Sequence, residues 1–239
     1  MNKTLLNCMN IALMTFMCLG FNACGGDNDN DPIPSQQNDN QGGNGTGNTD
    51  SASGMEVAQA VDLGLPSGTK WASWNMGAST PEENGNRYSW GEVEPKEFYT
   101  QNTYTLGDLW KSYMGRNIQG TSYDVAHVKW GGNWVMPTIE QIKELSGNCD
   151  RRVGTKNGVD GVYFIGPNAN SIFMPFDPDF EGSAKTTFYW SCSVDKFWDN
   201  DLNEHKGPLT LVIYNAAFPS DILGVLNGWG GRFVRAVTK

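Results

Sequence analysis

The segment VDLGLPSGTKWA occupies residues 61–72, and its opening run, Val61–Leu65, predicts a short β-strand. Further short runs predict strands at Arg87–Trp90, Val162–Ile165, Ile172–Met174, Phe188–Val194, Leu209–Tyr214 and Arg232–Val237. These strands do not alternate regularly with helices, which argues against a doubly wound parallel sheet. We therefore expect an α+β protein with a mostly antiparallel sheet and long structured loops.

The clearest helix is predicted at Thr138–Ser146. Its first residue can cap the helix together with Gln141, three positions on, and Gly147 is expected to end it. Leu106–Met114 is a second helix candidate because its apolar residues fall on one face. A single helical turn is predicted at residues 79–83, with a proline at its first helical position. Helices thus account for a small part of the predicted fold.

The composition limits the classes of partner and indicates one domain. The 239 residues include 17 Lys and Arg against 26 Asp and Glu, and the net charge of −9 argues against nucleic acid as a partner. All nine Trp lie within residues 56–239, which no second linker divides, so this stretch is expected to form a single domain. Four of them are expected to pack in its core: Trp71, Trp90, Trp134 and Trp190.

Residues 1–23 resemble the signal peptide of a bacterial lipoprotein. One basic residue, Lys3, precedes a mostly apolar run at Leu5–Phe21, which is too short and too interrupted to span a membrane. Two glycines follow Cys24, so cleavage is expected just before Cys24, whose acyl chains would hold the protein on a membrane. The alternative is a plain secreted protein with an odd cysteine near its start.

Residues 24–55 are expected to be the lipidated cysteine and a disordered acidic tether. Residues 25–55 hold five Asp, no Lys or Arg and almost nothing apolar, so they cannot bury enough surface to fold. A flexible chain of this length spans about 30 Å. The short sequence Asp50-Ser51-Ala52 resembles a bacterial O-glycosylation motif, with Ser51 as the acceptor.

The acidic run Asp27–Asp31 follows the expected anchor directly. It resembles the signal that sends some Gram-negative lipoproteins to the outer face of the outer membrane, although a solvated acidic linker would have the same composition. The protein is therefore expected to be exported and lipid-anchored at the outer membrane, on the cell surface. The membrane is then a partner through the lipid anchor.

Several motifs in the domain follow the order of one protein family. They are Val61–Ala72, Asn75–Ala78, Pro81–Gly85, Tyr88–Glu92, Gly132–Thr138, Gly166–Asn168, Ile172–Pro175, Tyr189–Ser191 and Gly231–Val237. Over nearly all of residues 57–239 they resemble the Fibrobacter succinogenes major paralogous domain, which is common in surface lipoproteins of anaerobic Gram-negative bacteria. The resemblance implies a C-type-lectin-like fold, with a small twisted antiparallel sheet and one or two flanking helices. It also implies that Val61–Leu65 and Arg232–Val237 lie near each other.

The sequence lacks the motifs that indicate catalysis. It has no Gly-x-Ser-x-Gly motif and no glycine-rich phosphate loop, and its two histidines, His127 and His205, show no metal-ligand spacing. The sulfur-dependent enzymes of the lectin-like superfamily use paired cysteines near the end of the domain, whereas the last 47 residues here contain none. No catalytic residue is predicted. Cys149 and Cys192 remain, and two alternatives stay open for them: a disulfide, or free thiols.

One loop, Asp195–Lys206, carries candidate ligand-binding residues. They are Trp198, Asp199, Asn200, Asp201 and Glu204. Calcium is the cofactor that this loop would take, because Asp199, Asp201 and Glu204 supply the oxygen ligands that it prefers. Trp198 would stack on a sugar ring, and the group partly matches an element of sugar-binding C-type lectins. The alternative is a solvated acidic loop without any cofactor. A second aromatic stretch, Phe98–Tyr104, is no more specific.

These features predict a noncatalytic surface lipoprotein whose lectin-like domain recognises a glycan or a surface protein. One alternative is a structural or assembly component of a surface appendage or adhesin, which needs no small ligand. A second alternative, a glycan-acting or sulfur-modifying enzyme, would need convergent carboxylates or a reactive cysteine in one cleft. The carboxylates of the acidic loop lie on one segment and do not define an opposing acid and base.

Overall fold

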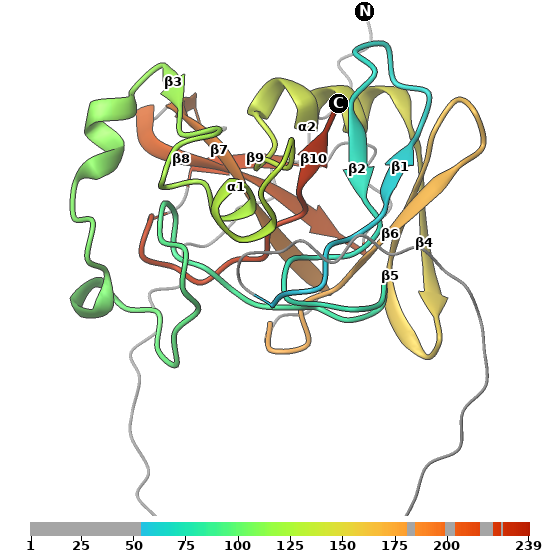
Figure 1. Ribbon diagram of the computed structural model, residues 1–239, viewed down its shortest axis with the longest axis horizontal. Helices are drawn as coiled ribbons and strands as arrows, with labels where there is room; N and C mark the ends of the chain where they lie inside the picture. Colours follow the sequence, from blue (N-terminus) through green and yellow to red (C-terminus); the bar gives the residue numbers. More distant parts are fainter. Residues whose placement is uncertain (1–53, 181–184, 199–203, 216–221, 226) are drawn as a thin grey trace, which may run out of the picture. The chain divides into compact units, whose positions relative to one another are not determined.

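The longest strand pair of the fold consists of β7 (Thr186–Trp198) and β8 (Glu204–Tyr214), which run antiparallel (Figure 1). The computed structural model describes residues 54–239 except 181–184, 199–203, 216–221 and 226. β9 (Ile222–Val225) pairs with β8, and β3 (Arg116–Asn117) pairs with β7, which gives a sheet in the order β3-β7-β8-β9. The strands predicted at Phe188–Val194 and Leu209–Tyr214 are thus confirmed.

Alternate side chains of β7 enter two different hydrophobic clusters, because successive residues of a strand point to opposite faces. Trp190, Cys192 and Val194 pack in the first cluster, with Trp90. Tyr189 packs in the second cluster, with Leu211 of β8. This part of the sheet is therefore buried on both faces, and the core of the domain lies on either side of it.

Two three-stranded antiparallel sheets complete the strand topology. One has the order β1-β2-β10, formed by Ala60–Asp62, Lys70–Ala72 and Val237–Thr238. The other has the order β4-β5-β6, formed by Asp150–Lys156, Val159–Ile165 and Ser171–Pro175. In the first sheet Val61 and Val237 both face Trp71 across the ladder. The two end segments of the domain therefore meet on either side of β2, as expected.

The helices are short, and caps define them. α2 (Ile139–Asn148) begins with the predicted capping box between Thr138 and Gln141, but it continues past Gly147, whose φ is not left-handed. α1 (Val125–Trp130) was not predicted. Its cap, the fully buried Asp124, accepts backbone N–H bonds from residues 120, 126, 127 and 136. Burial raises the pKa of this carboxyl, although the N–H donors oppose the shift.

The other two predicted helices are wrong. Within Leu106–Met114 only a 3-10 helix forms, η2 (Leu109–Tyr113), and η1 (Gln101–Thr103) precedes it. Residues 79–83 form bends and a turn in place of a helical turn. Both backbone and hydroxyl of Ser79 donate to the Glu83 carboxylate, at 2.7 and 3.1 Å, so a side chain closes this turn. Residues 73–115 are therefore a long structured loop with little regular helix.

The predicted strand Val61–Leu65 ends at Asp62 in the structure. Two further predicted strands are wrong, because their hydrogen bonds go to several partners. At Arg87–Trp90 only Tyr88 forms a bridge, to Arg232, while Trp90 bonds to the carbonyl of Gly228. The segment Arg232–Val237 contacts residues 88, 189, 76, 72 and 135 in turn, and only its last residue belongs to a regular strand, β10. A ladder requires one neighbour over successive residues, which neither segment has.

The buried side chain of Arg235 ties three parts of the core together. Its guanidinium donates to Asn75 Oδ1 at 2.8 Å, to the Ala72 carbonyl at 3.0 Å and to the Phe173 carbonyl at 2.7 Å. Among the described residues it has no carboxylate partner, and burial lowers its pKa to about 10. Arg235 therefore remains charged at neutral pH and acts through hydrogen bonds to neutral acceptors.

The tryptophans predicted to pack in the core do so. Trp71, Trp90 and Trp190 are fully buried, and Trp134 is partly buried with its ring centre 5.2 Å from that of Trp130. The described residues form a sheet-rich α+β domain with mostly antiparallel strands and few helices. In this part of the chain, no helix has the length and apolar character that a membrane crossing requires.

Candidate functional site

A hollow of about 320 Å³ is lined by four segments of the chain. One wall comes from residues 84–87 and another from residues 95–99. Pro178, Asp179 and Phe233 complete the lining. The size is that of a small-ligand site, and both polar groups and ring faces line it.

Arg87 is the central polar side chain of the hollow. It forms ion pairs with Asp177 and with Asp179, the second at 2.8 Å. Its guanidinium carbon lies 5.1 Å from the centre of the Phe233 ring, a cation–π distance. The Arg87 side chain is 27% exposed, so its position is fixed while part of it still faces solvent. Asp179 is 72% exposed and offers acceptor oxygens beside it.

Tyr99 contributes a ring whose position is fixed by three contacts. Its hydroxyl accepts a bond from the Lys96 backbone N–H at 2.9 Å and donates to the Arg87 carbonyl. The ring lies against Gly231, where a Cβ atom would come within 2.5 Å of the Tyr99 ring. Glycine is required at position 231 because any side chain would push this ring away from its place.

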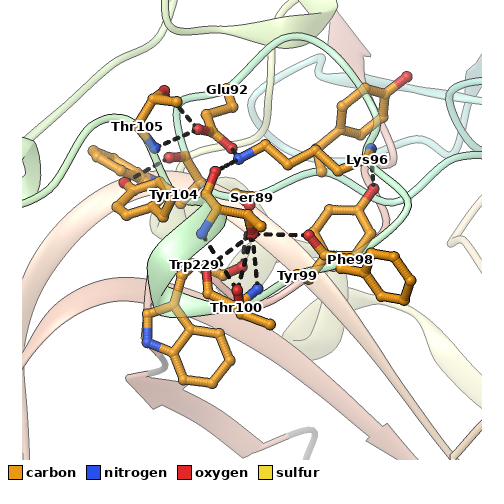
Figure 2. A network of polar contacts seen from close by, with 12 residues as sticks. Ser89, Glu92, Lys96, Phe98, Tyr99, Thr100, Tyr104, Thr105 and Trp229 are labelled. Atoms are coloured by element: carbon orange, nitrogen blue, oxygen red, sulfur yellow. Dashed lines mark hydrogen bonds and ion pairs between the residues drawn. The ribbon is translucent and has the colours of Figure 1, made fainter.

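A buried carboxylate holds the loop that carries Tyr99. Glu92 accepts bonds from the backbone N–H and the hydroxyl of Thr105, at 2.8 and 2.7 Å, and forms an ion pair with Lys96. Figure 2 shows the Lys96 side chain reaching from the side of Tyr99 toward this carboxylate. Burial by itself raises the pKa of Glu92, but the bonds to Lys96 and Thr105 outweigh it and lower the pKa. Lys96 and Thr105, at the two ends of the loop that contains Tyr99, are thus both bonded to Glu92.

The same loop is fastened to residues 88–92, which in turn bond to Trp229. The Tyr104 hydroxyl donates to the Trp90 carbonyl at 2.9 Å. The Ser89 hydroxyl donates to the Trp229 carbonyl at 3.1 Å, as Figure 2 shows. Burial raises the pKa of Tyr104, so its proton stays in place as the donor. The wall of the hollow formed by residues 95–99 is therefore a fixed surface built by many short-range bonds.

The charges around the hollow are largely matched within the protein. Arg87 is paired with Asp177 and Asp179, and Lys96 is paired with Glu92. Glu97 also lines the hollow, so carboxylates outnumber cations around it. A surface with hydrogen bonds, a ring face and this acidic surplus favours an uncharged polar ligand over an anionic one. In the described part of the chain, no group of three His, Cys, Asp or Glu side chains is placed to hold a metal ion.

The acidic segment predicted as a ligand-binding loop is largely strand. β7 extends to Trp198 and β8 begins at Glu204, and these two residues face each other in the ladder. The Glu204 carboxylate is paired with Lys206 at 2.6 Å and Lys196 at 3.0 Å, bonds that lower its pKa. Glu204 does not line the hollow. The remaining candidates of this segment, Asp199, Asn200 and Asp201, lie outside the described residues, as do Cys24 and Ser51.

Of the two alternatives left open for the cysteines, the structure has free thiols at both positions and no disulfide between them. Cys149 ends α2 and packs against the second hydrophobic cluster, while Cys192 is buried in the first. Burial raises the pKa of the Cys149 thiol to about 11 and also raises that of Cys192. Low thiolate content makes both thiols poor nucleophiles at neutral pH.

We expect the thiols of Cys149 and Cys192 to react slowly as long as the protein is folded. At pH 8 Cys149 should react with iodoacetamide on the order of a hundredfold more slowly in the folded than in the unfolded chain, because its thiolate fraction is that much smaller. Its rate should rise with pH up to about 11, where the thiol titrates. Mass spectrometry of the chain labelled without reductant, before and after unfolding in urea, measures both the difference in rate and its dependence on pH. An unfolded chain that takes up no label at either cysteine would show a disulfide.

Sequence reasoning did not find Arg87, Asp177 or Asp179 as site residues. Arg87 and Asp177 are 90 positions apart, and no local motif links them. The only signal was the aromatic stretch Phe98–Tyr104, which contains Tyr99. The two tyrosines of that stretch, Tyr99 and Tyr104, stabilise the loop as well as forming a surface. The sequence alone does not separate these two roles.

Comparison of the chain with models of protein families, with curated proteins and with solved structures finds no match. The hollow and its charges must therefore carry the functional argument. Its strongest feature is a fixed arginine beside a fixed tyrosine ring in a surface whose charges are internally paired.

Proposed function

We propose that this protein is a noncatalytic surface lipoprotein, anchored at Cys24, whose C-type-lectin-like domain recognises a neutral glycan. The hollow beside Arg87 and Tyr99 is the glycan site. The observation that carries the proposal is the pairing of Arg87 with Asp177 and Asp179 next to the ring of Tyr99. The resemblance to a surface-lipoprotein family supports the anchor and the lectin-like fold.

A glycan suits this surface better than a charged ligand. Sugar hydroxyls both donate and accept hydrogen bonds, and Arg87 supplies donors while Asp179 supplies acceptors. The apolar C–H face of a sugar ring packs well on an aromatic ring, which Tyr99 provides. An acidic glycan would have to compete with Asp177 and Asp179 for the guanidinium. A neutral one leaves those ion pairs in place.

A glycan array tests the proposal with the full chain, in the presence of calcium and of a chelator. The array includes neutral, uronic acid-containing and sialylated glycans. We expect selective binding of neutral glycans that survives the chelator and changes little with ionic strength, since no net charge is exchanged. Binding abolished by the chelator and by Trp198→Ala would place the site in the 195–206 hairpin instead. No binding by a folded chain would favour the assembly role.

The anchor is tested separately by Cys24→Ala. We expect this variant to leave the membrane fraction and to lose acyl labelling, because a chain without lipid has no span to hold it there in our proposal. Fractionation of cells with labelled palmitate, using Cys149→Ala as the matched cysteine control, measures both properties. A Cys24→Ala variant that stays on the membrane with unchanged labelling would refute the lipoprotein reading.

A further inference from the structure

A second hollow, of about 400 Å³, opens next to the first. Its lining consists of the first described residues, Gly54–Glu56, together with Gly77–Ser79 and Asn86. Most of these are small residues or backbone, so the space is wide and carries little charge. Ser79 and Gly77 are exposed, whereas Ala78 is buried beneath them.

The side chain of Asn86 stands between the two hollows and lines both. Its backbone N–H donates to the Met76 carbonyl at 2.8 Å, and its amide lies 3.4 Å from the Tyr88 hydroxyl. Gly77 lies directly against this amide: a Cβ there would overlap it, and the φ of +80° at Gly77 favours glycine. The partition between the hollows is therefore one fixed amide side chain, which itself can bond to a ligand that passes over it.

We propose that the two hollows are adjacent subsites for one extended neutral glycan, with consecutive sugar units on either side of Asn86. This inference rests on the proposed function and specifies its ligand as a chain of several sugars. The first subsite supplies the ring of Tyr99 and the donors of Arg87. The second supplies room, backbone groups and the exposed Ser79, and it has one charged lining residue, Glu56.

The charge distribution supports a single continuous ligand. In the first hollow the cations are paired within the protein, and the second hollow contains no basic side chain among its lining residues. A ligand with a negative charge on each unit would find no basic partner at the second subsite and would meet Glu56 there. A neutral chain gains contacts at both, and its affinity increases with the number of units bound.

The test uses the full chain and the neutral oligosaccharide series represented on the array: cello-, malto-, xylo- and chito-oligosaccharides of two to six units. Affinity for the series that binds should rise by about tenfold between two and four units and then level off. Ser79→Phe narrows the second hollow at an exposed position, so it should flatten this rise while leaving the shortest ligand's affinity unchanged. Ser112→Phe, on the exposed 3-10 helix η2, is the matched control and should behave as the parent.

The outcomes separate the two proposals. Equal affinity for all lengths, or an unchanged rise in Ser79→Phe shown to be folded by circular dichroism, overturns the second subsite and leaves glycan recognition intact. Weaker binding of every length by Ser79→Phe also overturns it, because the subsites would then not be separate. A folded chain that binds no oligosaccharide and no array glycan overturns both.

Discussion

Replacing Arg235 with methionine is expected to destabilise the folded protein strongly. The substitution keeps side-chain volume, so the packing loss is small, but it leaves Asn75 Oδ1 and the Ala72 and Phe173 carbonyls without their donors. Each buried acceptor left without a partner costs about 1–3 kcal/mol. The sum is about 4 kcal/mol or more, a large part of the 5–15 kcal/mol typical of a folded domain.

Urea unfolding followed by tryptophan fluorescence measures this loss. For a domain of this size, the expected fall in melting temperature is about 10 °C. Arg235→Lys should fall between the parent and Arg235→Met, because one ammonium cannot reach three acceptors that a planar fork reaches together. Arg152→Ala removes an exposed arginine and should leave the midpoint unchanged. An Arg235→Met variant as stable as the parent would mean that the three acceptors are satisfied by other means.

Prediction from sequence succeeded where one segment decides its own structure. The capping box of α2 is such a case, because Thr138 and Gln141 are three residues apart and bond to each other's backbone. β5, β6, β7 and β8 were also predicted, since each is a continuous run of strand-forming residues. The coarse class, a sheet-rich α+β domain with antiparallel strands, follows from these elements.

Prediction failed where distant partners decide the structure. β2 has three residues and exists because β1 and β10 pair with its two edges. β4 is polar and largely exposed, and it is a strand because β5 pairs with it over seven residues. The segment Asp195–Lys206 has the composition of a loop, yet β7 extends to Trp198 and β8 begins at Glu204. Glu204 pairs with Lys196 on the opposite strand and with Lys206 on its own strand.

The candidate site also depends on contacts between residues that are distant in the sequence, so it could not be predicted from local patterns. Tyr99 is placed by Lys96, by the Arg87 carbonyl and by the absence of a side chain at Gly231. Gly231 begins one of the family-like motifs, and the structure identifies the group that lies against it as the Tyr99 ring. The charge pairing of Arg87 depends on where the turn at residues 177–180 lies in the fold, because Arg87 is 90 positions away from Asp177.

Replacing Arg87 with alanine is expected to weaken glycan binding by more than about tenfold, the equivalent of at least one lost charge-assisted hydrogen bond. The same change removes the ion-pair partner of Asp179, which lines the hollow, and of the 11% exposed Asp177 next to it, so the hollow gains uncompensated negative charge. Both effects reduce affinity for a neutral ligand. Arg87→Lys keeps the charge beside Asp177 but loses the planar fork, and we expect it to recover only part of the binding.

Two further variants separate the loss of a ligand contact from the loss of structure. Asp179→Asn changes a side chain that is 72% exposed, so folding should be unaffected, while binding should fall by a few-fold because an acceptor is weakened. Arg152→Ala removes one positive charge from the exposed face of β4 and controls for net charge. Isothermal titration with the array-selected glycan, after circular dichroism of each variant, gives the affinities. A folded Arg87→Ala chain that binds as tightly as the parent would exclude this hollow as the site, because Arg87 lines it and supplies the donors of the proposed contact.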